Sequence, residues 1–164
     1  MPTVTEQLCH ALRTGGPLDE PLHQFVLETN SRAAGLWRLR DKHLEMIGFA
    51  SVDDMPRETD RGFREVTGRV SLAQNQFGIV RAVNTNSPTL AQRDPRDTGL
   101  TGSASWLVKF ECQTSLAIPL RDPATQAIIG AIAVSTTDTL HEQHPVWTTI
   151  ITLGVEVSRE FQPE

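Results

Sequence analysis

Cys112 is the residue of this chain with the widest range of possible chemistry, because a thiolate can act as a nucleophile or a redox centre. Its neighbours do not clearly favour the thiolate. Glu111 raises the pKa of a nearby thiol, and Lys109 is the only cation close to it in sequence. We therefore expect an inert, partly buried thiol. Cys9, the other cysteine, lies far away without the spacing of a redox pair or a zinc site, which predicts reduced thiols.

The stretch His141-Glu142-Gln143-His144 is a second group that could do chemistry. Two imidazoles at positions i and i+3 could share a metal, with Glu142 as a third ligand. No other histidine or cysteine lies near them in sequence, so we expect no metal site. His144 precedes Pro145, which favours a solvated position at the start of a helix. The remaining histidines form no recognisable triad with serine and aspartate: His10, His23 and His43.

The segment from Thr98 to Ser105 combines glycines and hydroxyl groups just before an expected helix. Backbone N–H groups in such a position could bind the phosphate or carboxylate of a ligand. The alternative is that the glycines form turns and that Ser103 caps the helix. The segment lacks the lysine of a P-loop, so nucleotide hydrolysis of that type is not indicated. The candidate ligand-binding residues here are Thr98, Gly99, Thr101, Gly102, Ser103 and Ser105.

Charged and aromatic residues flank this segment. Arg93-Asp94-Pro95-Arg96-Asp97 could clamp a polar ligand through a guanidinium group, although we favour a solvated loop. Trp106 and Phe110 could roof an aromatic ligand, whereas on a short amphipathic helix such residues usually belong to the core. The charged stretch around Phe63 predicts a short surface helix that acts as a lid.

Two predicted hairpins position these groups. Ser115–Leu120 and Ala127–Val134 have the composition of two buried strands separated by turn-forming residues, which predicts an antiparallel hairpin. Pro119 suits a sheet edge or a strand end, because it lacks an N–H group. Gly35–Leu39 and Leu44–Ala50 carry branched and aromatic residues and predict another hairpin.

Helices are expected at both ends of the chain, with further elements in the middle. The expected elements are a helix from Val4 to Leu12, a helix capped by Asp19 or Glu20, a helix over Asn75–Val83, a strand over Pro88–Ala91, a helix containing Trp106, and a last helix from Pro145. The last helix should bury a stripe made of Trp147, Ile150, Ile151, Gly154, Ser158 and Phe161, flanked by Val146, Leu153 and Val157.

Length and charge limit the classes of protein to consider. A chain of 164 residues with ordinary apolar content matches one domain. The formal net charge of −5 argues against a nucleic-acid partner, which needs a basic surface. No apolar run approaches the ~20 residues of a membrane-spanning helix, and no charged leader precedes such a run. We expect a cytoplasmic protein with neither a nucleic-acid nor a membrane partner.

The order of the expected elements resembles that of a GAF domain. The resemblance rests on Gly35–Leu39, Val70–Val83, Ser87–Leu90 and the hairpin from Ser115 to Val134, and it covers nearly the whole chain. It implies an α+β fold, in which a central antiparallel sheet of five to six strands has helices on both sides and the N- and C-terminal helices pack together.

The resemblance also implies how one GAF-like domain occupies residues 1–164. The N-terminal helices would span 1–33, the sheet and the pocket-covering segments 34–136, and the C-terminal helix 145–161. A ligand pocket would lie on the sheet face covered by the middle section. The candidate ligand-binding residues are then Phe63, Thr98, Gly99, Thr101, Gly102, Ser103, Ser105, Trp106, Phe110 and Cys112.

By the same resemblance, the chain would be a non-catalytic sensory module of signal transduction that binds an unknown small molecule. GAF domains that bind cyclic nucleotides carry an Asn-Lys-Phe-Asp-Glu signature, which is absent here. Bilin-attaching GAF domains have histidine after the cysteine, whereas Gln113 follows Cys112. Neither ligand is inferred, and no cofactor and no metal are expected.

Two alternatives stay open. Free methionine sulfoxide reductases resemble GAF domains, which makes a small redox enzyme that uses Cys112 an alternative, although they carry several cysteines in the pocket. The other alternative is a dimerisation or docking module without a ligand. The resemblance further implies a homodimer through the terminal helices and a signalling partner protein. The apolar residues expected at the dimer interface are Leu22, Phe25, Val26, Trp147, Ile151 and Phe161.

Overall fold

The computed structural model describes residues 2–93 and 100–161. In this part of the chain one antiparallel sheet of six strands, in the order β3-β2-β1-β6-β5-β4, lies among six helices. The α+β class and the antiparallel sheet are as predicted. The helices are α1 Val4–Thr14, α2 Asp19–Glu28, α3 Arg57–Thr67, α4 Gly78–Thr85, α5 Thr101–Phe110 and α6 Pro145–Ser158. The strands are β1 Ala33–Arg40, β2 His43–Ser51, β3 Arg69–Ser71, β4 Thr89–Gln92, β5 Thr114–Arg121 and β6 Ile128–Thr136.

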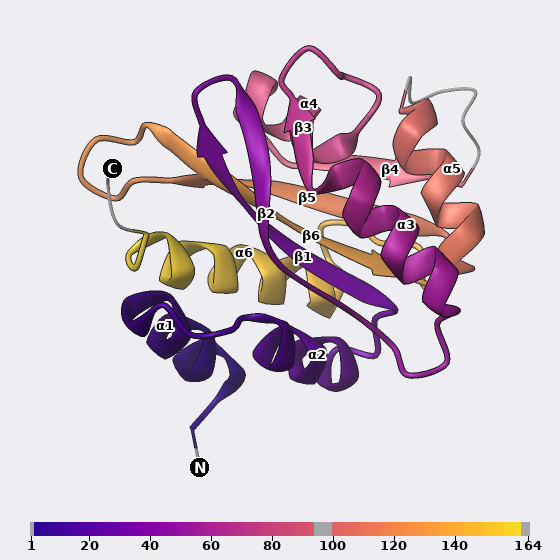
Figure 1. Ribbon diagram of the computed structural model, residues 1–164, viewed down its shortest axis with the longest axis horizontal. Coiled ribbons are helices and arrows are strands. Elements are labelled where there is room, and N and C mark those ends of the chain that lie inside the picture. The colour runs from indigo at the N-terminus through magenta and orange to yellow at the C-terminus, as the bar shows by residue number, and fades with distance from the viewer. Residues whose placement is uncertain (1, 94–99, 162–164) are drawn as a thin grey trace.

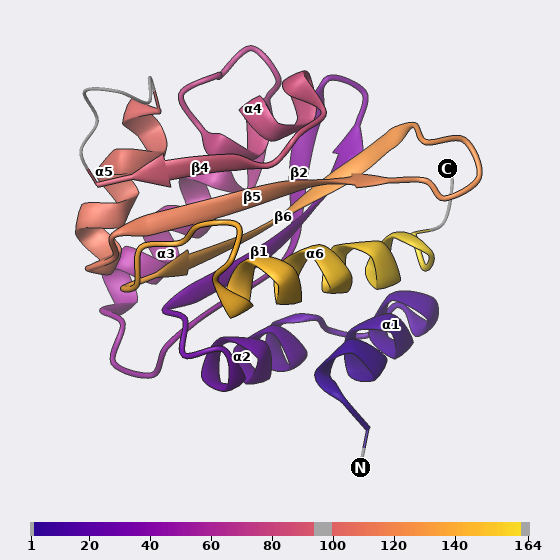
Figure 2. The same cartoon turned by 180° about the vertical axis from the view of Figure 1, so that it is seen from behind.

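The helices form two layers on opposite faces of the sheet. Figure 1 shows α1, α2 and α6 together on one face, with α3, α4 and α5 on the other side, and Figure 2 shows the same arrangement from behind. Helices α1 and α6 meet in the first layer, where Arg13 of α1 forms an ion pair of 2.7 Å with Glu160, just after α6. The predicted packing of the N-terminal helices against the C-terminal one is confirmed.

The strand register gives the two faces of the sheet different side chains. Leu36, Ile132 and Ile118 are aligned across β1, β6 and β5 and pack in the core cluster of the terminal helices. The neighbouring row, Gly35, Ala133 and Ala117, faces α3, α4 and α5. Side chains alternate along a strand, so these two rows lie on opposite faces of the sheet. The row on the first face has large aliphatic side chains, whereas the row on the second has only glycine and alanine.

The capping residues predicted for the first two helices can be compared with the structure. Thr3 and Glu6 form a capping box at the start of α1, and Gly15 ends this helix with φ of 71°, as expected of a helix-ending glycine. The predicted cap of α2 by Asp19 or Glu20 is wrong. Its N-cap is Leu18, which makes no side-chain bond, and the Asp19 carboxylate accepts a hydrogen bond from the Phe49 N–H group at 3.0 Å.

Both predicted hairpins are present, as β1–β2 and β5–β6. Pro119 lies within β5, which continues to Arg121, so it does not end the strand. The edge position is nevertheless correct. β4 pairs only with Thr114–Ala117, and in the described part of the chain no strand lies beside β5 at Pro119 on that side. A residue without an N–H group therefore costs the sheet no hydrogen bond there.

Three details differ from the sequence prediction. The short strand β3 was not expected, and α4 begins at Gly78, later than Asn75. The predicted buried stripe of α6 is partly wrong, because Ile151 is 37% exposed. The residues expected to flank the stripe, Val146, Leu153 and Val157, are buried. Nearly every side chain of α6 is apolar or small, so hydropathy alone could not select the face that meets the sheet.

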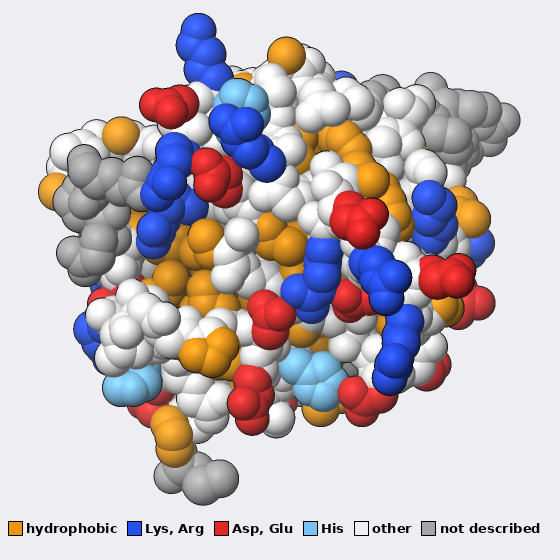
Figure 3. Space-filling model, in the orientation of Figure 1, with side chains coloured by type: hydrophobic (Ala, Val, Ile, Leu, Met, Phe, Trp, Pro, Cys, Tyr) orange, Lys and Arg blue, Asp and Glu red, His pale blue; other side chains and the backbone are white. Residues whose placement is uncertain are grey.

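The surface in the orientation of Figure 1 carries intermixed charges. Figure 3 shows the described Lys and Arg side chains interspersed with Asp and Glu, with apolar side chains visible between them. None of the helices in residues 2–93 and 100–161 combines the length and the apolarity that a membrane crossing requires.

Candidate functional site

A cavity of about 40 Å³ lies between the sheet and the helices α3, α4 and α5. The sheet provides its floor, and aromatic side chains provide most of its roof. This is the side of the sheet on which the sequence predicts a ligand pocket. Its geometry follows from three features: a low floor, an aromatic roof, and a set of polar contacts that hold the roof helices in place.

The floor is made of small residues at alternating strand positions. Ala33 and Gly35 on β1, Ala133 on β6 and Ala117 on β5 all line the cavity. Gly35 cannot be replaced without movement, since a Cβ atom there would lie 2.5 Å from the ring of Trp37. The low floor leaves room for aromatic rings to lie directly over the strands.

Two hydroxyl groups interrupt this apolar floor. Ser115 and Ser135 are register partners on β5 and β6, and both line the cavity. Ser135 is only 8% exposed. Within the described residues neither side-chain hydroxyl has a hydrogen-bond partner. Both hydroxyl oxygens keep some accessible surface. Ser115 is half-buried, and both hydroxyls are available to water or to another molecule in the cavity.

Phe63 is the centre of the aromatic roof. Its ring lies 4.9 Å from that of Phe49, 5.0 Å from that of Phe110 and 5.2 Å from that of Trp106, measured between ring centroids. The pairs with Phe110 and Trp106 are edge-to-face, an arrangement that is favourable beyond the burial of area. Trp37 completes the cluster with a centroid distance of 6.3 Å from Phe63. The roof therefore joins α3, α5 and the strands β1 and β2 in one cluster.

Polar contacts fix α3 and α5 above the floor. The Trp37 Nε1–H group donates a hydrogen bond of 2.8 Å to the carbonyl of Thr67, at the end of α3. The hydroxyl of Ser103 on α5 accepts one of 2.8 Å from the Gly78 N–H group at the start of α4. The predicted cap of α5 by Ser103 is therefore wrong: α5 begins after Leu100, and Ser103 serves the neighbouring helix.

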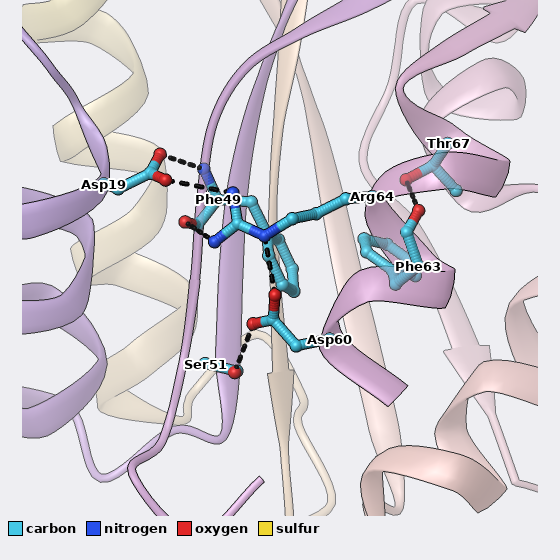
Figure 4. Close-up of polar contacts among 7 residues, drawn as sticks. All are labelled: Asp19, Phe49, Ser51, Asp60, Phe63, Arg64 and Thr67. Atoms are coloured by element: carbon cyan, nitrogen blue, oxygen red, sulfur yellow. Dashed lines mark hydrogen bonds and ion pairs between the residues drawn. The ribbon is translucent and has the colours of Figure 1, made fainter. Parts of the chain in front are cut away.

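Arg64 connects α3 to the opposite layer (Figure 4). Its guanidinium group donates to Asp60 at 2.6 Å, to Asp19 of α2 at 2.9 Å and to the Phe49 carbonyl at 2.8 Å. Asp60 in turn accepts a hydrogen bond of 2.7 Å from Ser51. Burial lowers the pKa of Arg64, but hydrogen bonds to the two carboxylates outweigh burial and raise it.

Asp19 and Arg64 together complete the free edge of β2. The β3 strand pairs only with residues 43–45 of β2, so the N–H and C=O groups of Phe49 point away from the sheet. Asp19 accepts from this N–H group and Arg64 donates to this carbonyl. The two side chains thus take the place of a neighbouring strand and satisfy groups that would otherwise invite pairing.

No charged side chain lines the cavity among the residues that the structure describes. Two cations near the roof lie on the side of its rings that faces away from the cavity. Arg64 lies over Phe49, with its guanidinium carbon 5.1 Å from the ring centroid, and the Lys109 ammonium lies 4.1 Å from the ring centroid of Trp106. These cation–π contacts stabilise the roof from outside and leave the interior uncharged.

Cys112 is buried close to the end of α5 but does not line the cavity. Burial raises the pKa of its thiol to about 12. Arg32 and Arg93 lower this pKa, and Glu111 raises it. The sequence predicted a partly buried thiol, whereas Cys112 is completely buried. Cys9, whose pKa burial also raises, belongs to the core cluster on the other face of the sheet, so the two thiols do not share a pocket.

The structure distributes the predicted site residues over three groups. Phe63, Ser103, Trp106 and Phe110 line the cavity. Thr101, Gly102, Ser105 and Cys112 are described and do not line it. Thr98 and Gly99, like residues 94–97 of the predicted charged clamp, lie outside the described residues.

Sequence reasoning missed the floor and part of the roof. Trp37, Phe49, Ser115 and Ser135 all line the cavity. Three of these residues could have been found from the alternation of side chains along a strand. Once the two hairpins are paired, every second residue counted from Gly35, and the residues aligned with these on the neighbouring strands, must face the same side of the sheet as Gly35. Trp37, Ser115 and Ser135 follow from that alternation together with the register.

The histidine stretch has the structural role that the sequence favours. His144 is the N-cap of α6, where its Nδ1 atom accepts a hydrogen bond of 3.1 Å from the Val146 N–H group. Its Nε2 atom lies 3.1 Å from the Asp138 carboxylate. Among residues 2–93 and 100–161, no group of three His, Cys, Asp or Glu side chains is arranged to hold a metal ion.

Solved structures similar to this chain are GAF domains or share their fold. The A. aeolicus nlh2 GAF domain in an inactive state is 11% identical with a TM-score of 0.66, over 96% of this chain and 93% of that one. The type II free methionine-R-sulfoxide reductase from Thermoplasma acidophilum is 15% identical with a TM-score of 0.58, over 94% and 96%. The phycoerythrobilin-bound GAF domain from a cyanobacterial phytochrome is 11% identical with a TM-score of 0.55, over 96% and 94%.

No family model matches the sequence, and no curated protein matches it. Identities this low establish the fold and nothing finer. The chain has the GAF fold, as its order of elements predicts.

Proposed function

We propose that this chain, which has the GAF fold, is a non-catalytic sensory module that binds a small molecule in the cavity under α3, α4 and α5. The observation that carries the proposal is the pair of unpartnered hydroxyls, Ser115 and Ser135, in a cavity whose other side-chain hydroxyls, those of Thr67 and Ser103, already have partners. A tightly packed core would place apolar groups at these positions. The two hydroxyl oxygens are instead open to the cavity, so that water or a ligand can pair with them.

The size of the cavity indicates that binding moves the roof. A volume of about 40 Å³ holds a few water molecules. Sites for organic ligands have ~300–1,000 Å³. Phe63 is the ring whose displacement would open most space, because it touches the other roof rings and belongs to α3, which covers the sheet from outside. Helix α3 then acts as the lid that its charged sequence predicts.

The residue after Phe63 gives the lid a connection to the terminal helices. Arg64 bonds Asp19 of α2 as well as Phe49 at the cavity wall. A ligand that displaces Phe63 would shift Arg64 and weaken its bond to Asp19. The position of α2 would then report whether the cavity is occupied, and a dimer or a signalling partner at the terminal helices would receive that signal.

A thermal unfolding screen tests the proposal. A molecule that binds only the folded state stabilises it by ~2.7 kcal/mol when its concentration is a hundredfold above its Kd. For a domain of this length that raises Tm by roughly 5–10 °C. Native mass spectrometry of the purified protein would identify a molecule that remains bound. If no metabolite in a broad panel raises Tm and none co-purifies, the proposal is wrong, and the result favours the alternative of a docking module without a ligand.

A second candidate function is a methionine sulfoxide reductase, which the fold similarity to the Thermoplasma acidophilum enzyme supports. The chemistry of Cys112 weighs against it, since a thiol with a pKa of about 12 carries almost no thiolate near neutral pH. Free methionine sulfoxide is also a zwitterion, and the described cavity lining has no charged side chain to pair with it. Turnover of methionine sulfoxide by the wild type, lost in Cys112→Ser, would establish this function instead.

A further inference from the structure

We infer that the ligand of this cavity is a neutral, flat ring compound whose hydrogen-bonding edge meets Ser115 and Ser135. The inference rests on the proposed function and adds the chemical class of the ligand. It is carried by the shape of the cavity, by the absence of charge in its described lining, and by the arrangement of the two hydroxyls.

The shape of the cavity selects a flat molecule. Its floor consists of residues no larger than alanine or serine on adjacent strands, including Gly35, Ala117 and Ala133. Its roof consists of aromatic rings, with Phe63 and Trp106 at the centre. The cavity of about 40 Å³ is too small for a ring, so a ligand ring would take the place of Phe63 between the low floor and the remaining aromatic side chains. A planar ring keeps ring contacts of ~4.5–7 Å there, which a puckered ring of the same size does less well.

The electrostatics select a neutral molecule. Two cations that bond residues of the cavity wall have partners outside the cavity: Arg64 has Asp19 and Asp60, and Arg32 bonds the Phe110 carbonyl at 2.6 Å. The N–H group of Gly78, at the start of α4, is taken by Ser103. A carboxylate, phosphate or ammonium group would lose its hydration in the cavity without gaining an opposite charge from the described lining, which is costly.

The hydroxyls select an edge that both donates and accepts. Ser115 and Ser135 are opposite each other on neighbouring strands, and each hydroxyl can give one hydrogen bond and accept others. Neither has a partner within the described residues. A planar amide or a ring with adjacent N–H and C=O groups would satisfy both at once. The carboxamide of an aromatic ring is the simplest probe of this class.

Four compounds of similar size separate these three properties. Benzamide is flat and neutral, benzoate is flat and anionic, benzamidine is flat and cationic, and cyclohexanecarboxamide is neutral but puckered. Their Kd values are measured by NMR titration of the wild type and of Phe63→Ala, in which deleting the roof ring enlarges the cavity. We expect benzamide to bind at least tenfold more tightly than each of the other three in the enlarged cavity.

The hydroxyl contact is tested by substitution in the Phe63→Ala background. Ser135→Ala and Ser115→Ala should each raise the Kd for benzamide roughly fivefold to tenfold, since each removes one hydrogen bond. Ser105→Ala is the matched control: it lies on the exposed side of α5, does not line the cavity, and should leave the Kd unchanged.

The outcomes separate the ligand class from the proposed function. Benzoate or benzamidine binding as tightly as benzamide overturns neutrality, and cyclohexanecarboxamide doing so overturns flatness. No effect of either serine substitution overturns the hydroxyl contact. If none of the four probes binds either protein while some other metabolite raises Tm, the ligand class is wrong and the sensor stands. If no compound of any kind binds, the proposed function falls as well.

Discussion

At the scale of single residues, Cys112 makes the free energy of unfolding depend on pH in the alkaline range. Its folded pKa is raised from 9.0 to about 12, so the folded state holds the thiol proton more tightly than the unfolded chain does. The stabilising contribution is complete below pH 9.0 and is lost as pH rises toward 12. We expect the free energy of unfolding in urea to fall between pH 9 and pH 11, and to fall less steeply in Cys112→Ala.

The same burial predicts that Cys112 is unreactive in the folded protein. Alkylation by iodoacetamide needs the thiolate and access to it, and the thiol here has neither. Near neutral pH, mass spectrometry should find Cys112 unlabelled in buffer and labelled in urea. Rapid labelling of the folded wild type at this position would contradict the buried thiol and would favour the reductase alternative. The place of Cys112 between an expected helix and an expected buried strand indicated burial despite its polar neighbours Glu111 and Gln113, whereas the strength of the pKa shift needed the structure.

At the scale of elements, Arg64 is the side chain that connects α3 to both β2 and α2. Arg64→Ala removes one hydrogen-bond donor from each of the Phe49 carbonyl, Asp19 and Asp60, which we expect to cost about 2 kcal/mol. The amide hydrogens of α3 should exchange roughly 30-fold faster if the helix opens locally by that amount. Hydrogen exchange followed by mass spectrometry or NMR measures both the size and the location of the effect.

Arg61→Ala is the control on the same helix, because Arg61 is exposed and the structure gives it no ion pair within the described residues. It should change neither the free energy of unfolding nor the exchange of α3 by a measurable amount. Equal effects of both substitutions would mean that Arg64 acts only through helix propensity or net charge. The connection from the lid to α2 would then lose its physical basis.

The elements that sequence predicted well are those with local signals. Gly15 ends α1, and Pro145 begins α6. The predictions that failed depend on distant partners: Ser103 caps a helix 25 positions away in sequence, and Asp19 bonds Phe49 and Arg64 rather than its own helix. A capping residue and a residue that bonds another element have the same local sequence, so only the tertiary arrangement separates them.

At the scale of the whole molecule, the two faces of the sheet have separate tasks. The face with Leu36 and Ile132 packs against the terminal helices, and the face with Gly35 and Ala133 lies under the cavity. The sequence predicted the two hairpins of the sheet, because hairpin patterns are local, and the resemblance to GAF domains implied the side on which the cavity lies. The sequence did not predict the floor, because the alternation of side chains becomes informative only after the pairing of β1 with β6, which brings together residues about 100 positions apart.

Dimerisation through the terminal helices stays a prediction, and the structure changes the residues that it can use. Leu22, Phe25 and Val26 are at most 3% exposed and belong to the core of one chain. On α6, Ile151 and Val155 are 37% and 52% exposed and lie one helical turn apart. If the homodimer forms, these two side chains are the apolar contacts that α6 offers to a partner.

Sedimentation equilibrium of the wild type and of Val155→Glu measures this contact. A glutamate in a symmetric interface is buried twice, so we expect dimer dissociation to increase at least tenfold. Val66→Glu is the matched control, because Val66 is 48% exposed but lies on α3, in the opposite layer. A dimer that survives Val155→Glu but not Val66→Glu would move the interface to the lid side, next to the cavity. A monomer at all concentrations would leave a partner protein as the receiver of the signal from α2.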